Sequence, residues 1–190
     1  MNTRRMTTAV AGLTIALISA HGVAPMAHGA EIESPPPARV DRGDGTAELD
    51  PGTIALCNAG LGDVSVKSYD TAELGKIDLF CGDSASGYVH IRDRHEGAWQ
   101  AQLDSLGGGT NWDDWMEYQV ASAVMDPASG YPIYIGDDKA CFTAPIEIVN
   151  SYGDVEDTFY PTVIVSMNNK KVITAIPTTD KVANNCVTAE

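Results

Sequence analysis

The chain has 190 residues and a formal net charge of −14, because 26 aspartates and glutamates outnumber 12 lysines and arginines. This excess of negative charge disfavours non-specific binding to nucleic acid or to anionic membranes. A nucleic-acid substrate would therefore need a local cationic site. No segment after residue 30 is long and apolar enough to be expected to cross a membrane.

The first thirty residues have the features of a secretory signal peptide. The positively charged start MNTRR is followed by a short apolar run and by the small residues around Ala27 and Gly29. We therefore predict a signal peptide over residues 1–30 and a secreted, extracellular protein with no membrane attachment after cleavage. Cleavage would remove Arg4 and Arg5 and change the net charge from −14 to −16, since two positive charges are lost.

Residues 31–52 are expected to form a flexible linker. Three consecutive prolines, Pro35 to Pro37, favour extended backbone, and apolar residues are sparse in this range. Residues 53–190 then remain as a single domain of roughly 140 residues, which is enough for a hydrophobic core of its own.

Four cysteines fall within this domain, and an even number in an exported chain predicts two disulfides. Three pairings are open; we favour the one in which each bond closes a local unit, Cys57–Cys81 and Cys141–Cys186. Each bond is expected to stabilise the fold by ~3–4 kcal/mol. A zinc site is disfavoured because the sequence has no Cys-x-x-Cys pair and no histidine at ligand spacing from a cysteine, so we expect no metal and no cofactor.

The first predicted element of the domain is a β-hairpin. Residues 63–70 and 76–81 alternate apolar and polar side chains around a short glycine-containing connection. From Tyr88 the pattern changes to helical spacing, with Ile91, His95 and Trp99 following on one face.

A second helix and three strands follow. The run Gly107 to Gly109 interrupts the chain, and the apolar spacing from Trp112 to Met125 predicts a helix with acidic residues in its first turn. Residues 140–150, 158–169 and 170–179 are rich in β-branched and aromatic residues, as strands are. The predicted fold is therefore α+β: an N-terminal hairpin, two helices, then a twisted antiparallel β-sheet with two disulfides.

The stretch GYVHIRDRHEGAW, residues 87–99, carries the candidate chemistry. It contains both histidines that remain after the predicted cleavage, His90 and His95, together with Arg92 and Arg94. Imidazole has a pKa suited to a general base, and guanidinium groups stabilise charge on a phosphate. Helical spacing of five residues predicts that the two histidines diverge by more than a right angle. The competing interpretation is a solvated helix face in which Asp93 and Glu96 pair with the arginines.

These residues also carry a resemblance. The motif His90-Ile-Arg-Asp-Arg-His95 and the late strand segment from Val172 to Pro177 are similar to motifs of the toxin ribonucleases of the barnase, EndoU, colicin E5/D and RelE superfamily. The resemblance implies a metal-independent endoribonuclease without cofactors, acting on RNA, in the manner of an antibacterial toxin that has a protein inhibitor as partner.

The same resemblance implies roles for individual residues. It assigns acid–base catalysis to His90 or His95, phosphate binding to Arg92 or Arg94, and a position near the scissile group to Thr174. Ile176 stands where many members of the superfamily have tyrosine, and Tyr160 or Phe159 could take its place. The aromatic residues expected to contact substrate are Tyr160 and Trp99.

The alternative function is a secreted, acidic, non-catalytic interaction module with the same fold. It would bind a basic protein partner through electrostatic attraction. Its support is the strongly negative charge and the missing tyrosine at position 176. The aromatic residues of the second helix could stack bases or sugars, but their spacing favours a place in the core; they are Trp112, Trp115 and Tyr118.

Overall fold

The computed structural model describes residues 38–41, 49–108, 111–178 and 186, with side chains for all of these except 38–41. They all belong to one structural unit, Glu33–Glu190. The predicted signal peptide lies outside the described residues, and so does most of the predicted linker.

The larger of the two sheets in the described residues is a mixed β-sheet of six strands. Within the described residues its strand order is β2-β3-β9-β8-β5-β4. The strands are β2 (Ser65–Thr71), β3 (Gly75–Phe80), β4 (Ile133–Ile135), β5 (Lys139–Phe142), β8 (Thr162–Ser166) and β9 (Lys171–Ile176). The predicted hairpin is present as antiparallel β2 and β3, and the predicted strands over 158–169 and 170–179 contain the antiparallel pair β8 and β9.

One pairing in this sheet was not predicted. Strand β3 lies parallel to β9, and the two are paired in register at Asp78 and Lys171. The N-terminal hairpin is therefore part of the same sheet as the late strands, and the prediction of a purely antiparallel sheet is wrong. Alternation within single strands carries no information about which strands become neighbours, and this pair is joined by a long helical crossover.

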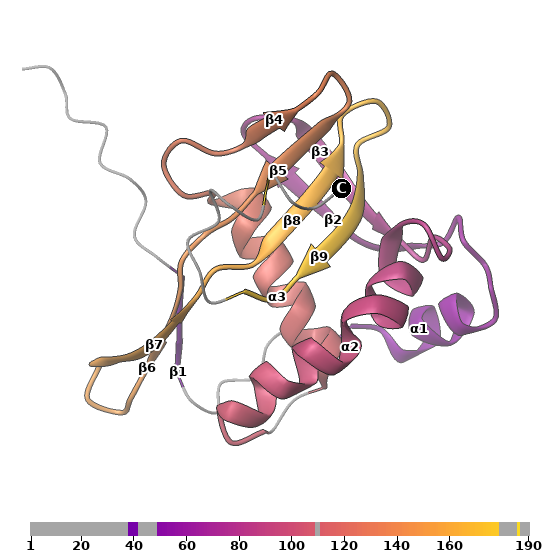
Figure 1. Cartoon of the computed structure of the whole chain (residues 1–190). Coiled ribbons are helices and arrows are strands. Elements are labelled where there is room, and N and C mark those ends of the chain that lie inside the picture. The colour runs from indigo at the N-terminus through magenta and orange to yellow at the C-terminus, as the bar shows by residue number, and fades with distance from the viewer. Residues whose placement is uncertain (1–37, 42–48, 109–110, 179–185, 187–190) are drawn as a thin grey trace, which may run out of the picture. The chain divides into compact units, whose positions relative to one another are not determined.

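A second sheet has the order β1-β6-β7, formed by β1 (Ala38–Asp41), β6 (Ile146–Val149) and β7 (Val155–Phe159). Strand β1 lies within the range expected to be a linker and pairs in parallel with β6. The β6–β7 hairpin projects from the rest of the described structure (Figure 1). Prolines explain why two predicted long strands are each divided, since Pro145 precedes β6 and Pro161 precedes β8.

The described residues contain three α-helices: α1 (Pro51–Asn58), α2 (Gly87–Ser105) and α3 (Trp112–Met125). Helix α1 was not predicted; it begins with Asp50 as N-cap, whose carboxylate accepts the Thr53 N–H at 2.7 Å. Helix α2 continues to Ser105, beyond the predicted histidine stretch. Helix α3 has the predicted range, with Asp113 and Asp114 in its first turn.

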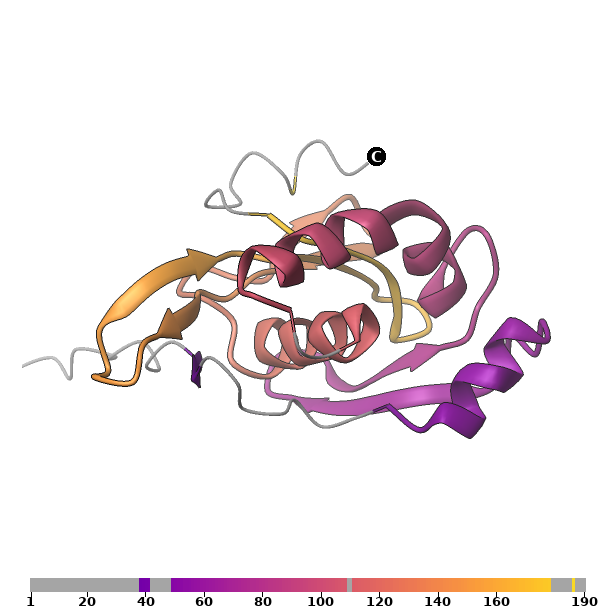
Figure 2. The same ribbon diagram turned by 90° about the horizontal axis from the view of Figure 1, so that it is seen from below.

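The hydrophobic core lies between the helices and the six-stranded sheet. Figure 2 shows α3 between α2 and the β2–β3 hairpin. The largest buried side chains include Trp99, Trp115, Ile77, Leu79 and Phe142. Trp115 is a core residue as predicted, whereas Trp112 and Tyr118 are half-buried at the edge of the core.

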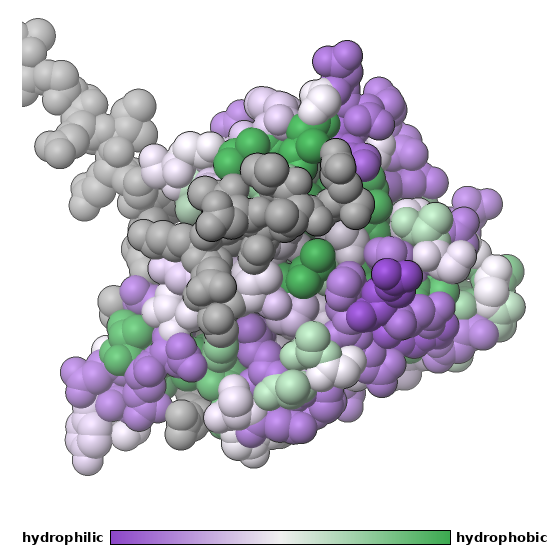
Figure 3. All heavy atoms as spheres, viewed as in Figure 1, coloured by the Kyte–Doolittle hydropathy of each residue, from purple (hydrophilic) through white to green (hydrophobic). Residues whose placement is uncertain are grey.

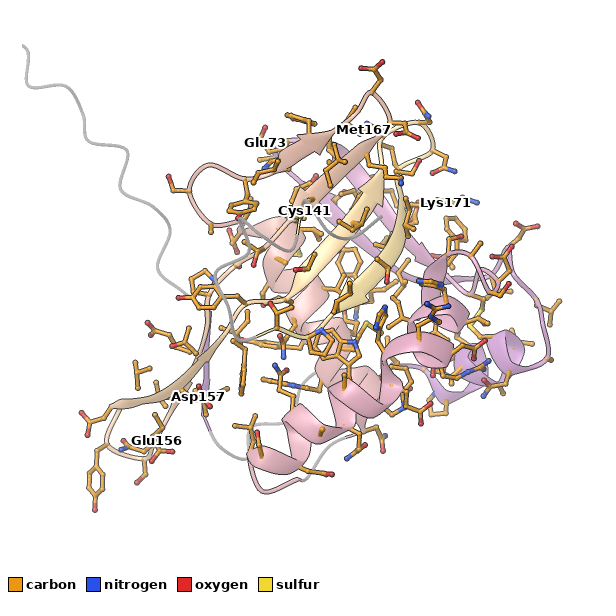
Figure 4. The ribbon with its side chains drawn as sticks, in the orientation of Figure 1. Glu73, Cys141, Glu156, Asp157, Met167 and Lys171 are labelled. Atoms are coloured by element: carbon orange, nitrogen blue, oxygen red, sulfur yellow. A yellow bond between two sulfur atoms is a disulfide. The ribbon has the colours of Figure 1, made fainter. Side chains whose placement is uncertain are left out.

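Both predicted disulfides are confirmed. Cys57 in α1 is bonded to Cys81 at the end of β3, and Cys141 in β5 is bonded to Cys186 (Figure 4 labels Cys141). Disulfides of this kind are typical of oxidising, extracellular environments. None of the helices within the described ranges has the length and apolar character needed to span a membrane.

Candidate functional site: the histidine–arginine face of helix α2

The loop that precedes α2 fixes the position of its first turn. The Asp83 carboxylate accepts the N–H groups of Ala85 at 2.8 Å and Ser86 at 3.2 Å. Gly82 has φ of +66°, and a Cβ atom there would lie 1.9 Å from the Ser86 carbonyl oxygen. The tight loop thus requires glycine at this position, and it turns the Ser84 carbonyl toward the helix.

That carbonyl orients His90. The Nδ1 atom of His90 lies 2.9 Å from the Ser84 carbonyl oxygen. A carbonyl oxygen can only accept a hydrogen bond, so Nδ1 carries a proton in this arrangement. The other ring nitrogen, Nε2, is then the one available for proton transfer.

The His95 ring lies against His90. The two ring centroids are 5.9 Å apart and the rings meet edge to face at 76°. The prediction that the two histidines diverge is therefore wrong. Side chains on a helix tilt toward its N-terminus, so the His95 ring is directed back toward the turn that carries His90.

The His95 imidazole is partly buried beside two basic side chains. Burial lowers the pKa of His95 below its ordinary value of 6.5, and the positive charges of His90 and Arg94 lower it further. At neutral pH His95 is therefore in its neutral form, which can accept a proton.

The two arginines of this stretch differ in what they bind. The Arg92 guanidinium donates to Asp93 through Nε at 3.0 Å and Nη2 at 2.7 Å, and through Nη1 to the Asn58 side chain of α1. This is the ion pair expected of a solvated helix face. Arg94 is exposed and lies close enough to His95 to influence its pKa. We call His90, Arg94 and His95 the histidine–arginine face; Figure 3 shows hydrophilic residues gathered over this half of α2.

Thr174 is not connected to this face by a hydrogen bond. It is 8% exposed, and its hydroxyl oxygen is buried without a hydrogen-bond partner in the described part of the chain. Thr174 is paired in register with Ile164, whose side chain packs with the Cys141–Cys186 disulfide. Cross-strand partners share a face of the sheet, so Thr174 belongs to the disulfide side.

The two aromatic residues expected to contact substrate occupy different surroundings. Tyr160 is half-buried and packs against the same disulfide cluster as Ile164. Trp99 is completely buried, and its indole N–H donates to the Ala175 carbonyl at 3.2 Å. The expected role of Trp99 in substrate contact is therefore corrected: its ring is part of the core and is closed to a ligand.

Sequence reasoning missed Ser84 and Asn58, which bind His90 and Arg92. A backbone carbonyl and a residue 34 positions away leave no pattern in the sequence. The Gly82-Asp83-Ser84 run was the only available signal, because it predicts a tight turn just before the helix. No group of three histidine, cysteine, aspartate or glutamate side chains suited to a metal was found in the described ranges.

The arrangement provides one neutral imidazole, a second imidazole with a fixed orientation, and a nearby exposed guanidinium. These groups can accept a proton, deliver a proton and stabilise a negative charge within a small area of the surface. No family model and no curated protein matches this chain.

Proposed function

We propose that the protein is a secreted, metal-independent endoribonuclease, whose catalytic groups lie on the histidine–arginine face of α2. The observation that carries the proposal is the 5.9 Å separation of the His90 and His95 rings beside Arg94. One phosphodiester linkage placed against this face would be within reach of both imidazoles. The resemblance of the same residues to toxin ribonuclease motifs supports the assignment.

In this reaction the 2′-hydroxyl of RNA attacks the adjacent phosphorus. His95, neutral because its pKa is lowered, would accept the hydroxyl proton. A 2′,3′-cyclic phosphate forms and the bond to the 5′-oxygen breaks. His90, held through Nδ1 by Ser84, would deliver a proton from Nε2 to the departing oxygen. Arg94 would stabilise the negative charge on the phosphate oxygens.

The proposed mechanism uses fewer catalytic residues than the sequence predicted. Arg92 is already bound by Asp93 and Asn58, and the Thr174 hydroxyl is buried on the disulfide side of β9. The proposal therefore rests on His90, Arg94 and His95. Arg92 acts as a structural link between α2 and α1.

The test is cleavage of a short RNA by the oxidised protein in the presence of a chelator. We expect cleavage that requires a 2′-hydroxyl, so an otherwise identical oligonucleotide with deoxyribose at the cleavage position stays intact. His90→Gln and His95→Gln should each lower the rate by about 100-fold or more, as expected when a general acid or base is lost. Arg94→Gln should lower it as well.

Lys76→Gln is the matched control, because it removes one positive charge from the exposed hairpin rather than from α2. It should leave the rate unchanged. The proposal fails if the wild-type protein does not cleave RNA. It also fails if His95→Gln protein cleaves as fast as the wild type, since the activity would then come from another source.

A second candidate function, an acidic interaction module for a basic protein, is favoured by the β6–β7 hairpin. Tyr152 in its connecting turn is 89% exposed, and Asp154, Glu156 and Asp157 are exposed beside it (Figure 4 labels the last two). A test is salt-dependent binding of a lysine-rich peptide of defined length. Replacing Asp154 and Asp157 with asparagine should weaken it, and unchanged binding would contradict this function.

A further inference from the structure

A cavity of about 440 Å³ lies among the three helices, and none of the residues of the histidine–arginine face is among those that line it. Helix α1 contributes Ile54 and Asn58 to its lining, and Gln100 comes from α2. The start of α3 contributes Trp112, Asp113 and Asp114. A volume of this size accommodates a small ligand or one long side chain of a partner.

An aromatic ring forms part of the wall. Trp112 lines the cavity and is half-buried. Tyr88 is stacked on Trp112, with centroids 5.7 Å apart and an angle of 23° between the rings. This contact fixes the orientation of the indole. Fixed indole rings bind planar cations through cation–π contact and stacking.

Two carboxylates add negative charge to the same wall. Asp113 accepts the Tyr88 hydroxyl at 3.1 Å, and Asp114 accepts the Leu49 N–H at 2.7 Å and the Asn111 amide at 3.3 Å. All these donors are neutral. In the part of the chain that the structure describes, neither carboxylate forms an ion pair with a lysine or arginine.

Asp114 is a buried carboxylate in the wall of the cavity. Its residue is only 4% exposed, and its charge is compensated by neutral donors and by the N-terminal end of the α3 dipole, without a cationic partner in the described residues. Each carboxylate has about four acceptor positions, so acceptor capacity remains for a bound donor. A cation that enters the cavity would gain charge-assisted hydrogen bonds and neutralise buried negative charge.

The amide side chains of the wall favour a guanidinium over an ammonium group. Asn58 and Gln100 line the cavity together with the two aspartates, and the Asn58 oxygen already accepts a hydrogen bond from the chain's own Arg92. A guanidinium is flat and carries five N–H donors, so it can stack on the indole while donating to several oxygens. An ammonium group offers three donors and no flat surface.

We propose that this cavity binds a guanidinium group, such as an arginine side chain presented by a basic partner. This inference does not depend on the ribonuclease proposal, because the cavity uses α1, the C-terminal half of α2 and the start of α3. It would give the acidic protein one specific contact in addition to general electrostatic attraction.

The test is titration of the oxidised protein with N-acetyl-arginine amide, followed by the indole N–H signals in NMR spectra. N-acetyl-citrulline amide is the matched ligand, because it has nearly the same shape without the charge. We expect saturable binding of the arginine compound, with shifts at the Trp112 indole. The citrulline compound should bind at least about tenfold more weakly, as expected for the loss of a charge-assisted hydrogen bond.

Asp113→Asn should weaken binding of the arginine compound by about tenfold, and Trp112→Leu should weaken it as well. Asp70→Asn, an exposed change on β2 with the same loss of charge, should leave the affinity unchanged. Equal affinity for the two ligands, or no saturable binding of the arginine compound, would overturn the proposal. The ligand comparison uses wild-type protein, so it decides the question even if a variant fails to fold.

Discussion

The indole N–H of Trp99 in α2 donates a hydrogen bond to the carbonyl oxygen of Ala175 in β9, at 3.2 Å and across 76 residues of sequence. Strand β9 pairs with β3 at a single register position, Asp78 and Lys171. Beyond that point helix α2 packs along β9 instead (Figure 1). Trp99 therefore satisfies a backbone carbonyl at an edge that would otherwise have no partner strand.

Replacing Trp99 with phenylalanine should reduce the free energy of unfolding by about 2–3 kcal/mol. The variant leaves the Ala175 carbonyl buried without a donor and also creates a small cavity. Urea unfolding, followed by circular dichroism, measures this change. Trp112→Phe is the matched control, because that ring is half-buried and keeps its stacking on Tyr88. An equally small effect for both substitutions would contradict the role given to the Trp99 hydrogen bond.

The pKa of His95 should lie below 6.5 in an NMR titration, because burial is the largest cause of its shift and the charge of His90 is the second. His90→Gln removes that charge, so it should raise the pKa of His95 toward the ordinary value.

A lowered pKa in the folded state means that the unfolded chain binds more protons just below pH 6.5. Stability contributed by His95 is therefore present above pH 6.5 and is lost as pH falls toward the folded-state pKa. An unchanged pKa in His90→Gln would show that the ring contact has no electrostatic effect.

Two glycines near the histidines should respond to alanine in opposite ways. Gly82→Ala places a Cβ atom 1.9 Å from the Ser86 carbonyl oxygen at a residue with φ of +66°, so it should destabilise the protein by more than about 1 kcal/mol. Gly97 lies inside α2, where an added Cβ meets no atom within 4 Å. Gly97→Ala should stabilise by about 0.5–1 kcal/mol through helix propensity. Thermal unfolding measures both effects, and a stabilised Gly82→Ala would contradict the loop geometry.

The sequence predicted those parts of the fold that depend on local pattern. Alternation located the β2–β3 hairpin and helical spacing located α3. The even number of cysteines predicted two disulfides, and the preference for bonds that close a local unit predicted their pairing. Helix α1 was missed because its residues, Pro51–Asn58, show almost no amphipathic spacing. Its N-cap and first proline were the signals that could have located it.

The candidate site was predictable in composition but not in geometry. The residues of the histidine–arginine face all come from one predicted helix. Their arrangement depends on the Ser84 carbonyl and on side-chain tilt, neither of which helical spacing describes. The place of Thr174 depends on which face of β9 it occupies. The register between β8 and β9 shifts at Ile164 and Val165, and simple alternation cannot predict that irregularity.

Glu117 in α3 is a buried carboxylate that belongs to neither proposed site. This residue is 4% exposed, and its ion-pair partner among the described residues is Lys67 of β2, whose Nζ lies 3.8 Å from Oε1. Burial raises the pKa of Glu117 above 4.5, and the negative charge of Asp114 raises it further, against the opposing effects of Lys67 and the Tyr69 hydroxyl. Removal of the charge from water, together with repulsion by Asp114, therefore destabilises the charged form more than these two partners stabilise it.

Glu117→Gln should consequently make the protein more stable at neutral pH, because glutamine keeps nearly the same shape and carries no buried charge. A raised pKa means that the folded protein holds a proton which the unfolded chain has already lost above pH 4.5. The wild type should thus lose stability relative to Glu117→Gln as pH rises from 4.5 through the folded-state pKa, and the difference should then stay constant. Urea unfolding at a series of pH values measures this difference. Glu73→Gln, at an exposed position in the β2–β3 turn (Figure 4), is the control and should show no such trend. The opposite result would be a variant that has a lower free energy of unfolding than the wild type at pH 7 and nearly the same value at low pH. It would mean that the Lys67 ion pair outweighs the desolvation of the carboxylate.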